Sequence, residues 1–303
     1  MKKIIILLLA VSLLLAGCQA LSNIKLPKSL PGLSSGEDTG GSGSISAYFV
    51  NPKQGGSALK DYPFSPVVRI KSLGGYESDG QVCISGLDRE IFSGFSGCEC
   101  MSFKQEKDES GKFEHDDVSF GPYTLRIKQD DRKEHVVSSV TRFEYGNEIK
   151  ANISISRDAY ENTGCTASIN SATSGPLVVG IVEQETIPIT EDIVTLIFKI
   201  HASKAEEGRF ILEENLNDQC TPLSSEKLPV IRARAKGFPT RAPVTCRDVE
   251  ITGNDVTVVC EAKDISLIDS SGSALFGDNY SPEVIFELRY FFETTSSARF
   301  TVS

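Results

Sequence analysis

Apolar and polar side chains alternate along much of the chain beyond residue 45, and this pattern constrains the fold more than any other feature. Four segments carry it clearly: 123–128, 149–156, 193–200 and 284–292. Successive side chains of a strand point to opposite faces, so each segment is expected to bury one face against a core. No stretch keeps a helical period, and glycine-containing turns recur between the segments. The pattern predicts an all-β fold of antiparallel strands.

A weak internal repeat indicates two units of this kind. Residues 67–87 and 194–216 each read as a strand, a charged turn that ends at Gly80 or Gly208, and a second strand. This order resembles extracellular immunoglobulin-like modules of the CARDB type. The resemblance implies two tandem antiparallel immunoglobulin-like β-sandwich domains. The chain has no Trp, so it lacks the Cys…Trp…Cys pattern of antibody domains.

Composition and length fit a globular body of two domains. Hydrophobic residues make up 40 % of the chain and charged residues 24 %, which excludes a disordered or polytopic membrane protein. The formal net charge of −10 argues against a nucleic-acid partner. The segment 157–176 is rich in Asn, Ser, Thr and Gly. It predicts a boundary that divides the body into domains at residues 45–158 and 159–303.

The chain begins with features of an export signal. Two lysines are followed by an apolar run from Ile4 to Ala16, which is too short to span a bilayer as a helix of about 20 residues. The run ends in Leu15-Ala16-Gly17-Cys18, which resembles the lipobox of prokaryotic lipoproteins. The resemblance implies a signal peptide at residues 1–17, cleavage between Gly17 and Cys18, and lipid on Cys18. The alternative is an ordinary signal peptide with an incidental cysteine.

The segment that follows the lipobox is expected to be a tether. Residues 18–44 contain Gly- and Ser-rich stretches that are typical of flexible linkers. A short docking peptide at residues 24–31 is the alternative. The chain is therefore expected to be exported and lipid-anchored, with its body held off the outer face of the cell membrane or the outer membrane.

Seven cysteines follow the lipobox, and an exported protein is expected to pair them. Seven is odd, so one stays free or bonds another molecule. The spacing favours Cys83 with Cys98 or Cys100, Cys165 with Cys220, and Cys246 with Cys260. The last pair raises a conflict, because a two-residue turn at Gly253-Asn254 unites the apolar faces of Val249 and Val258 but puts Cys246 and Cys260 on opposite faces. A bulge would reconcile the two.

The Cys98-Glu99-Cys100 motif also invites a metal or redox interpretation. Zinc sites combine two Cys or His pairs at set spacing, whereas this motif stands alone. A disulfide with a spare thiol is the simpler interpretation. The sequence therefore predicts no metal and no cofactor.

No catalytic constellation is apparent, and the chain is not expected to be an enzyme. The three histidines, His115, His135 and His201, have no metal-binding spacing, and no nucleophile elbow or phosphate-binding loop occurs. Adjacent acids on a strand point to opposite faces, so such pairs are expected to be solubilising. An enzyme that builds its site from loop carboxylates stays open as a lesser alternative. Its candidate residues are Asp116, Asp117, Asp264 and Asp269.

Two surface features complete the candidates. Arg232, Arg234 and Lys236 alternate with alanines and form a basic stripe, which could recognise an anionic glycan, a lipid headgroup or an acidic protein. The alternative is an edge strand that is protected by charge. Asn152 and Asn279 begin N-glycosylation sequons.

These observations predict a lipid-anchored extracytoplasmic protein with a non-catalytic binding or structural role at the cell envelope. Its expected partners are the membrane, through lipid on Cys18, and an envelope protein or glycan. The alternative is a subunit of a larger surface assembly, such as an adhesion, secretion or pilus complex.

Overall fold

The computed structural model describes most of the chain beyond residue 44 and shows an all-β protein. The described residues are 45–59, 62–72, 78–105, 115–126, 134–156, 167–173, 175–216, 220, 227–238, 243–276 and 280–303. Their strands lie in one compact unit that spans residues 41–303. Residues 1–44, with the predicted leader, the lipobox-like motif and the predicted tether, lie outside the described residues, so the interpretations of Gly17 and Cys18 stay predictions.

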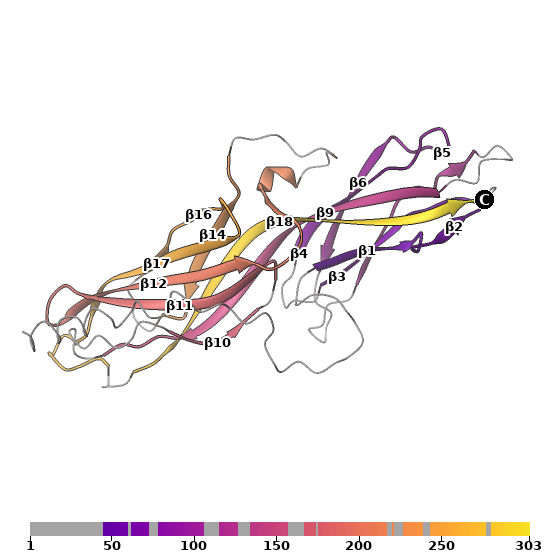
Figure 1. Cartoon of the computed structure of the whole chain (residues 1–303). Helices are drawn as coiled ribbons and strands as arrows, with labels where there is room; N and C mark the ends of the chain where they lie inside the picture. The colour runs from indigo at the N-terminus through magenta and orange to yellow at the C-terminus, as the bar shows by residue number, and fades with distance from the viewer. Residues whose placement is uncertain are drawn as a thin grey trace, which may run out of the picture. The chain divides into compact units, whose positions relative to one another are not determined.

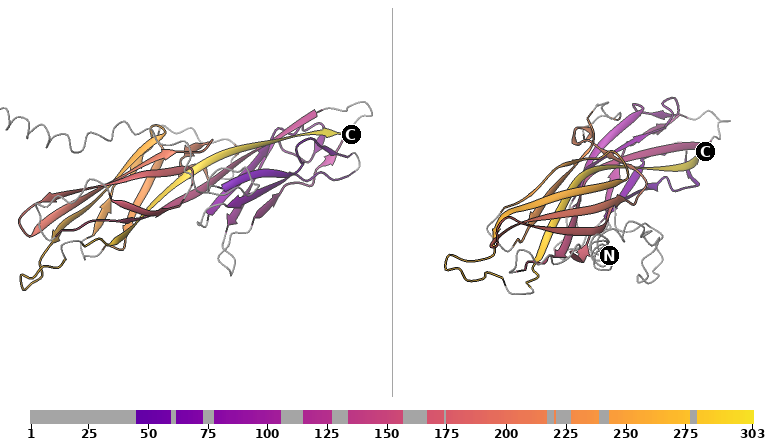
Figure 2. Two further views of the ribbon diagram at one scale, coloured as in Figure 1. Left: turned by 60° about the horizontal axis from the view of Figure 1, so that its bottom comes forward. Right: turned by 60° about the vertical axis from the view of Figure 1, so that its left-hand side comes forward.

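Two long strands form the centre of the fold. β9 (Glu134–Asn152) and β18 (Glu283–Val302) pair antiparallel along their whole length, from Glu134 with Thr301 to Asn152 with Glu283. Figures 1 and 2 show the two strands side by side, β9 in magenta and β18 in yellow. Every other strand of the nine-stranded sheet is added to this ribbon or to its neighbours.

The N-terminal half of β9 carries the strands from the first part of the chain. β4 (Ser78–Ser85) pairs with residues 138–143 of β9, and β6 (Cys98–Gln105) pairs with β4. β2 (Gly56–Ala58) adds a parallel strand to the end of β18. Two smaller sheets lie at this end. They are β1 (Ile45–Asn51), β3 (Val67–Ser72) and β7 (Asp116–Ser119), and β5 (Phe92–Ser93) with β8 (Thr124–Leu125).

The other half of the ribbon carries strands from the second part of the chain. β10 (Ser168–Ala172) pairs with β9, whereas β13 (Arg209–Ile211) and β14 (Val230–Lys236) pair with β18. A separate four-stranded sheet has the order β11 (Leu177–Pro188), β12 (Ile193–Lys204), β17 (Asp255–Ser266) and β15 (Val244–Cys246). The rings of Phe198 on β12 and Phe286 on β18 lie 5.4 Å apart, so this sheet packs on the ribbon.

The hydrophobic core follows the alternation in the sequence. Val194, Leu196, Phe198 and Ile200 of β12 are all buried, and the buried aromatic rings of β18 contact both ends of the core. At the first end, Phe64 stacks on Phe300 at 5.1 Å. Burial of one such side chain contributes about 1.5–3 kcal/mol. These contacts fix both ends of the fold on one ribbon.

The structure confirms the predicted all-β, antiparallel class. The predicted boundary between residues 158 and 159 falls between β9 and β18, which are neighbours in one sheet. The last strand in sequence therefore contributes to both ends of the body. Among the described residues, no helix is long and apolar enough to cross a bilayer.

The conflict at Cys246 is resolved by a change of sheet. Cys246 on β15 lies directly opposite Cys260 on β17, and the two are bonded. Val249 belongs to β16 (Val249–Glu250), which pairs with Ile231 of β14 and not with β17. The chain thus leaves one sheet and enters another between residues 246 and 249, so Val249 is not required to face Val258.

Candidate functional site

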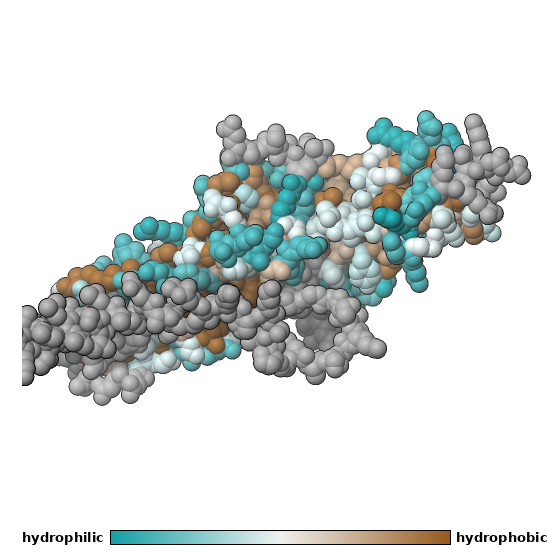
Figure 3. All heavy atoms as spheres, in the orientation of Figure 1, coloured by the Kyte–Doolittle hydropathy of each residue, from teal (hydrophilic) through white to brown (hydrophobic). Residues whose placement is uncertain are grey.

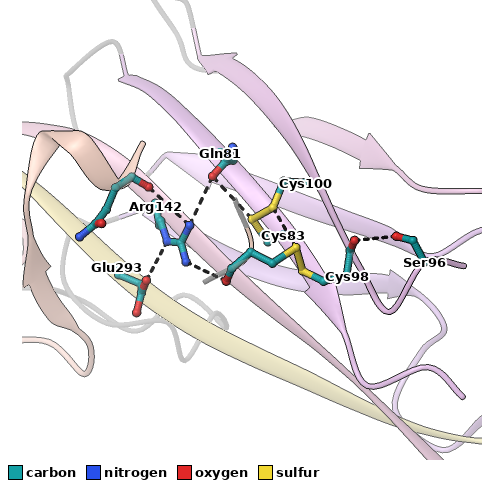
Figure 4. Close-up of a disulfide and its surroundings, with 9 residues drawn as sticks. Gln81, Cys83, Ser96, Cys98, Cys100, Arg142 and Glu293 are labelled. Carbon is teal, nitrogen blue, oxygen red and sulfur yellow. Dashed lines mark hydrogen bonds and ion pairs between the residues drawn. A yellow bond between two sulfur atoms is a disulfide. The ribbon is translucent and has the colours of Figure 1, made fainter. Parts of the chain in front are cut away.

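Four cysteines meet on one face of β4 and β6 and form the most distinctive chemical group of the structure. Cys83 and Cys100 are cross-strand partners, with their Cα atoms 4.0 Å apart. Cys98 lies two residues from Cys100 and so shares its face of the strand. Cys220 belongs to the segment that follows the short 3₁₀ helix η2 (Glu213–Asn215). We call Cys83, Cys98, Cys100 and Cys220 the four-cysteine cluster (Figure 4).

The cluster contains two disulfides in contact. One joins Cys83 to Cys100, and the other joins Cys98 to Cys220 across 122 residues of sequence. The two bonds lie side by side, because the unbonded Sγ atoms of Cys100 and Cys220 are 3.5 Å apart. The predicted pairing of Cys165 with Cys220 is therefore wrong. Cys165 itself lies outside the described residues, and spacing alone could not identify the partner, because β6 and the segment at Cys220 meet only through the tertiary fold.

A buried ion pair lies next to the cluster. Arg142 on β9 donates from Nε to Oε2 of Glu293 on β18 at 2.8 Å, and the two side chains are 1 % and 7 % exposed. Arg209 donates to the other carboxylate oxygen at 2.7 Å. Because both strands belong to the central ribbon, the pair joins its two strands at mid-length.

The same guanidinium also holds the segment that carries Cys220. Arg142 donates to the carbonyl oxygens of Asn215 at 3.4 Å and Cys220 at 3.3 Å. It also reaches Oε1 of Gln81 on β4 at 3.5 Å (Figure 4). A buried charge needs such partners, since an unpaired one costs several kcal/mol. The hydrogen bonds of Arg142 hold Asn215 and Cys220 to the ribbon, and the disulfide holds Cys220 to β6.

Glu99, between the two cysteines of β6, is engaged by a buried tyrosine. Tyr123 donates its hydroxyl proton to Oε2 of Glu99 at 2.6 Å. Burial, and next this hydrogen bond, raise the pKa of Tyr123 well above its usual value. The tyrosine therefore stays protonated and keeps its hydrogen bond to the carboxylate. We interpret the pair as a structural contact and not as a general acid and base.

The chemistry available to the four-cysteine cluster follows from its bonded state. Three of its sulfur atoms, on Cys83, Cys100 and Cys220, lie within 4.8 Å of one another. A metal ion would require them as thiolates, and the two disulfides withhold them. In the bonded state, the cluster presents two adjacent disulfides. Three of its four cysteines are partly exposed.

The four carboxylates that form the alternative, enzymatic candidate site do not converge. Asp116 and Asp117 lie on β7, whereas Asp264 lies on β17 in a different sheet. Arg69 binds Asp117 through two hydrogen bonds of 2.7 Å and lowers the pKa of that carboxyl. Asp269 accepts bonds from Ser271 and Ser273 within its own turn, which lowers its pKa also.

The histidines lie apart from one another. His115 is exposed, His135 on β9 packs against the rings of Phe92 and Phe300, and His201 on β12 lies 3.0 Å from Thr257. They come from separate strands or loops, so the described residues give no shared imidazole site.

The basic stripe is partly occupied by acids of the same chain. Lys236 binds Glu287 at 2.6 Å, and Arg232 binds Glu213. Arg234 is exposed. A shallow hollow of about 270 Å³ adjoins Arg232, with Val230 among its lining residues. In Figure 3, hydrophilic and hydrophobic residues lie side by side on the surface around β14.

Of the two glycosylation candidates, Asn152 and Asn279, only Asn152 lies among the described residues. Asn152 ends β9, half-buried, and its Oδ1 accepts a hydrogen bond from Asn170 at 2.9 Å. Asn279 lies outside the described residues.

Comparison with known proteins adds no assignment. No family model matches the chain, and no curated protein matches it.

Proposed function

We propose that this chain is a lipid-anchored extracytoplasmic protein with a non-catalytic binding or structural role at the cell envelope. Its anchor is lipid on Cys18, and its body carries two immunoglobulin-like modules that share the β9–β18 ribbon. Its partners are the membrane and an envelope protein or glycan. The lipobox-like Leu15-Ala16-Gly17-Cys18 is the single observation on which the anchor rests.

The disulfides support an oxidising location. Six described cysteines form three disulfides, and bonds of this kind persist outside the reducing cytosol. The Cys98–Cys220 bond joins segments 122 residues apart, so it stabilises the tertiary fold and not one hairpin alone. A body cross-linked in this way is suited to an exposed position at a cell surface.

Metabolic lipid labelling tests the anchor. Cells that express the full chain are fed an alkyne-tagged fatty acid, and the purified protein is assayed for the tag. We expect label on the chain without substitutions and on the control variant Cys165→Ser, and none on Cys18→Ser. Equal labelling of Cys18→Ser would overturn the lipid anchor.

A role as a subunit of a surface assembly is a second candidate, because β11 exposes apolar side chains. β11 is an end strand of its four-stranded sheet, and Val178, Ile181 and Ile187 on it are 36–40 % exposed. Exposed edge strands pair readily with other chains. Native mass measurement on detergent-extracted protein distinguishes this role, since an assembly subunit is recovered with other polypeptides and a lone binder is not.

A further inference from the structure

We propose that the four-cysteine cluster is a thiol–disulfide exchange site, at which a small thiol compound opens one disulfide and the two bonds then exchange partners. The inference goes beyond a binding or structural role. It rests on the body alone and is independent of the lipid anchor.

The distance between the two disulfides carries the inference. Sγ of Cys220 lies 3.5 Å from Sγ of Cys100, although each is bonded to a different cysteine. Exchange requires a thiolate to reach a sulfur of a disulfide, and reacting atoms about 3–3.5 Å apart are already close to attack. Once Cys220 is released, its sulfur reaches Cys100 with little movement of the backbone.

Exposure sets the order of events. Cys98, Cys100 and Cys220 are partly exposed, whereas Cys83 is 3 % exposed. An external thiolate therefore reaches the Cys98–Cys220 bond, which has both sulfurs on partly exposed residues, before the bond that includes Cys83. Arg142 holds the carbonyl oxygen of Cys220 at 3.3 Å, which keeps this residue in place when its sulfur is free.

Each step forms one sulfur–sulfur bond and breaks another. The external thiolate attacks Sγ of Cys98, makes a mixed disulfide there and releases the Cys220 thiolate. That thiolate attacks Sγ of Cys100, forms Cys100–Cys220 and releases the Cys83 thiolate. Cys83 then attacks Sγ of Cys98, forms Cys83–Cys98 and expels the external thiolate. The thiol compound is regenerated, and no net oxidation or reduction takes place.

The surroundings of Cys83 accommodate the released sulfur. Sγ of Cys83 lies 3.6 Å from Oε1 of Gln81, so a free thiol at this position has an acceptor for its proton (Figure 4). Nη1 of Arg142 also approaches this Gln81 oxygen, at 3.5 Å. Once the Cys83 thiolate released in the second step takes up a proton, its S–H therefore has a hydrogen-bond acceptor in the core.

Substitution of Cys83 isolates the central step. In Cys83→Ser, Cys100 is a free thiol beside the Cys98–Cys220 bond, and it exchanges with that bond without any added compound. We expect the full-length variant, in a Cys165→Ser background, to contain both Cys98–Cys220 and Cys100–Cys220. Free thiols are trapped with N-ethylmaleimide, and the disulfides are mapped by mass spectrometry. A protease that cleaves after Glu99 separates Cys98 from Cys100.

Cys246→Ser in the same background is the matched control. It also frees one thiol, Cys260, but on β17 and outside the four-cysteine cluster, so the cluster is expected to keep Cys83–Cys100 and Cys98–Cys220 alone. Circular dichroism verifies that both variants keep their strands. If folded Cys83→Ser contains only Cys98–Cys220, the proposal is overturned.

The unsubstituted cluster provides a second measurement that does not depend on the folding of Cys83→Ser. The full chain with Cys165→Ser is incubated with reduced glutathione and trapped in the same way. We expect Cys100–Cys220 to appear, with glutathione on Cys98 or with Cys83–Cys98. Glutathione on Cys98 while Cys83–Cys100 stays intact at all times would contradict the relay, as would no reaction at the cluster.

Discussion

Arg142 and Glu293 are cross-strand partners on β9 and β18, and their charged groups meet in the core at 2.8 Å. Both side chains are almost completely buried. The pair sits in the middle of the only two strands that contribute to both ends of the described body. Its partners at Gln81, Asn215 and Cys220 belong to three further segments, so one guanidinium organises five parts of the chain.

Loss of Arg142 is expected to destabilise the protein strongly. Arg142→Met leaves Glu293 buried with Arg209 as its ion-pair partner among the described residues, and breaking a buried pair in this way costs about 3–5 kcal/mol. Urea unfolding measures the loss. The exposed pair of Arg69 with Asp117 provides the control, because surface ion pairs contribute little and Arg69→Met is expected to cost far less than Arg142→Met.

The double variant Arg142→Met with Glu293→Leu examines the origin of that loss. Removal of both charges leaves no buried carboxylate, so the double variant should be more stable than Arg142→Met alone. If the losses of the two single variants simply add, the burial of the Glu293 carboxylate without Arg142 is not the cause.

The Cys98–Cys220 and Cys246–Cys260 disulfides should differ in their contribution to stability. The Cys98–Cys220 bond closes a span of 122 residues and the Cys246–Cys260 bond a span of 14. Chain entropy gives about 5 kcal/mol for the longer loop and about 3 kcal/mol for the shorter one. Urea midpoints of the paired Cys→Ala variants measure this. Equal losses would mean that loop length does not decide the effect.

The alternation of side chains identified individual strands but not their partners. The segments 193–200 and 284–292 are strands as predicted, because periodicity depends only on local sequence. The pairing of β9 with β18 could not be predicted, since it joins residues more than 100 positions apart. Arg142 illustrates the limit, because an arginine within a strand suggests an exposed face until Glu293 is placed opposite.

The same limit applies to the four-cysteine cluster. Spacing correctly favoured Cys246 with Cys260 and left Cys98 and Cys100 open as partners of Cys83. It could not place Cys220, whose contacts with Cys98 on β6 and with Arg142 on β9 arise only from the tertiary fold. The change of sheet at Val249 is invisible for a similar reason, since a short strand carries no mark of the sheet that it joins.

Loss of one hydroxyl at Tyr290 should weaken the second end of the body. The hydroxyl accepts from the backbone N–H of Leu177 at 3.1 Å and donates to Oδ1 of Asn147 at 2.8 Å. Tyr290→Phe removes an acceptor from a buried N–H, which costs about 1–3 kcal/mol. Tyr62→Phe, at a side chain that is 67 % exposed, should stay within about 0.5 kcal/mol of the parent. Thermal unfolding compares them, and equal shifts would contradict the role of the buried hydroxyl.

The Arg69–Asp117 pair should add a small stability increment that disappears in acid. Arg69 lowers the pKa of Asp117 in the folded state below its usual value of 3.8. The contribution is therefore complete above that value and is lost as pH falls through the lower, folded-state pKa. Both side chains are about one third exposed, so solvent screens the pair and the increment is small.

Asp117→Asn tests this dependence. The difference in unfolding free energy between parent and variant should be constant near neutral pH and shrink in strong acid. A difference that grows as pH falls would have the wrong sign for a carboxyl with a lowered pKa.

The position of β18 has a consequence for biosynthesis. β9 is made before the whole segment 153–282, yet one entire side of it has no partner until β18 follows. Until β18 is made, the backbone N–H and C=O groups along that side of β9 lack their partners in the sheet. Unpaired strand edges of this kind favour aggregation, and pairing between distant segments is slow. A nascent chain stalled before residue 283 should therefore depend on holding chaperones, whereas release of β18 would let the strands at both ends of the described body pair with it at once.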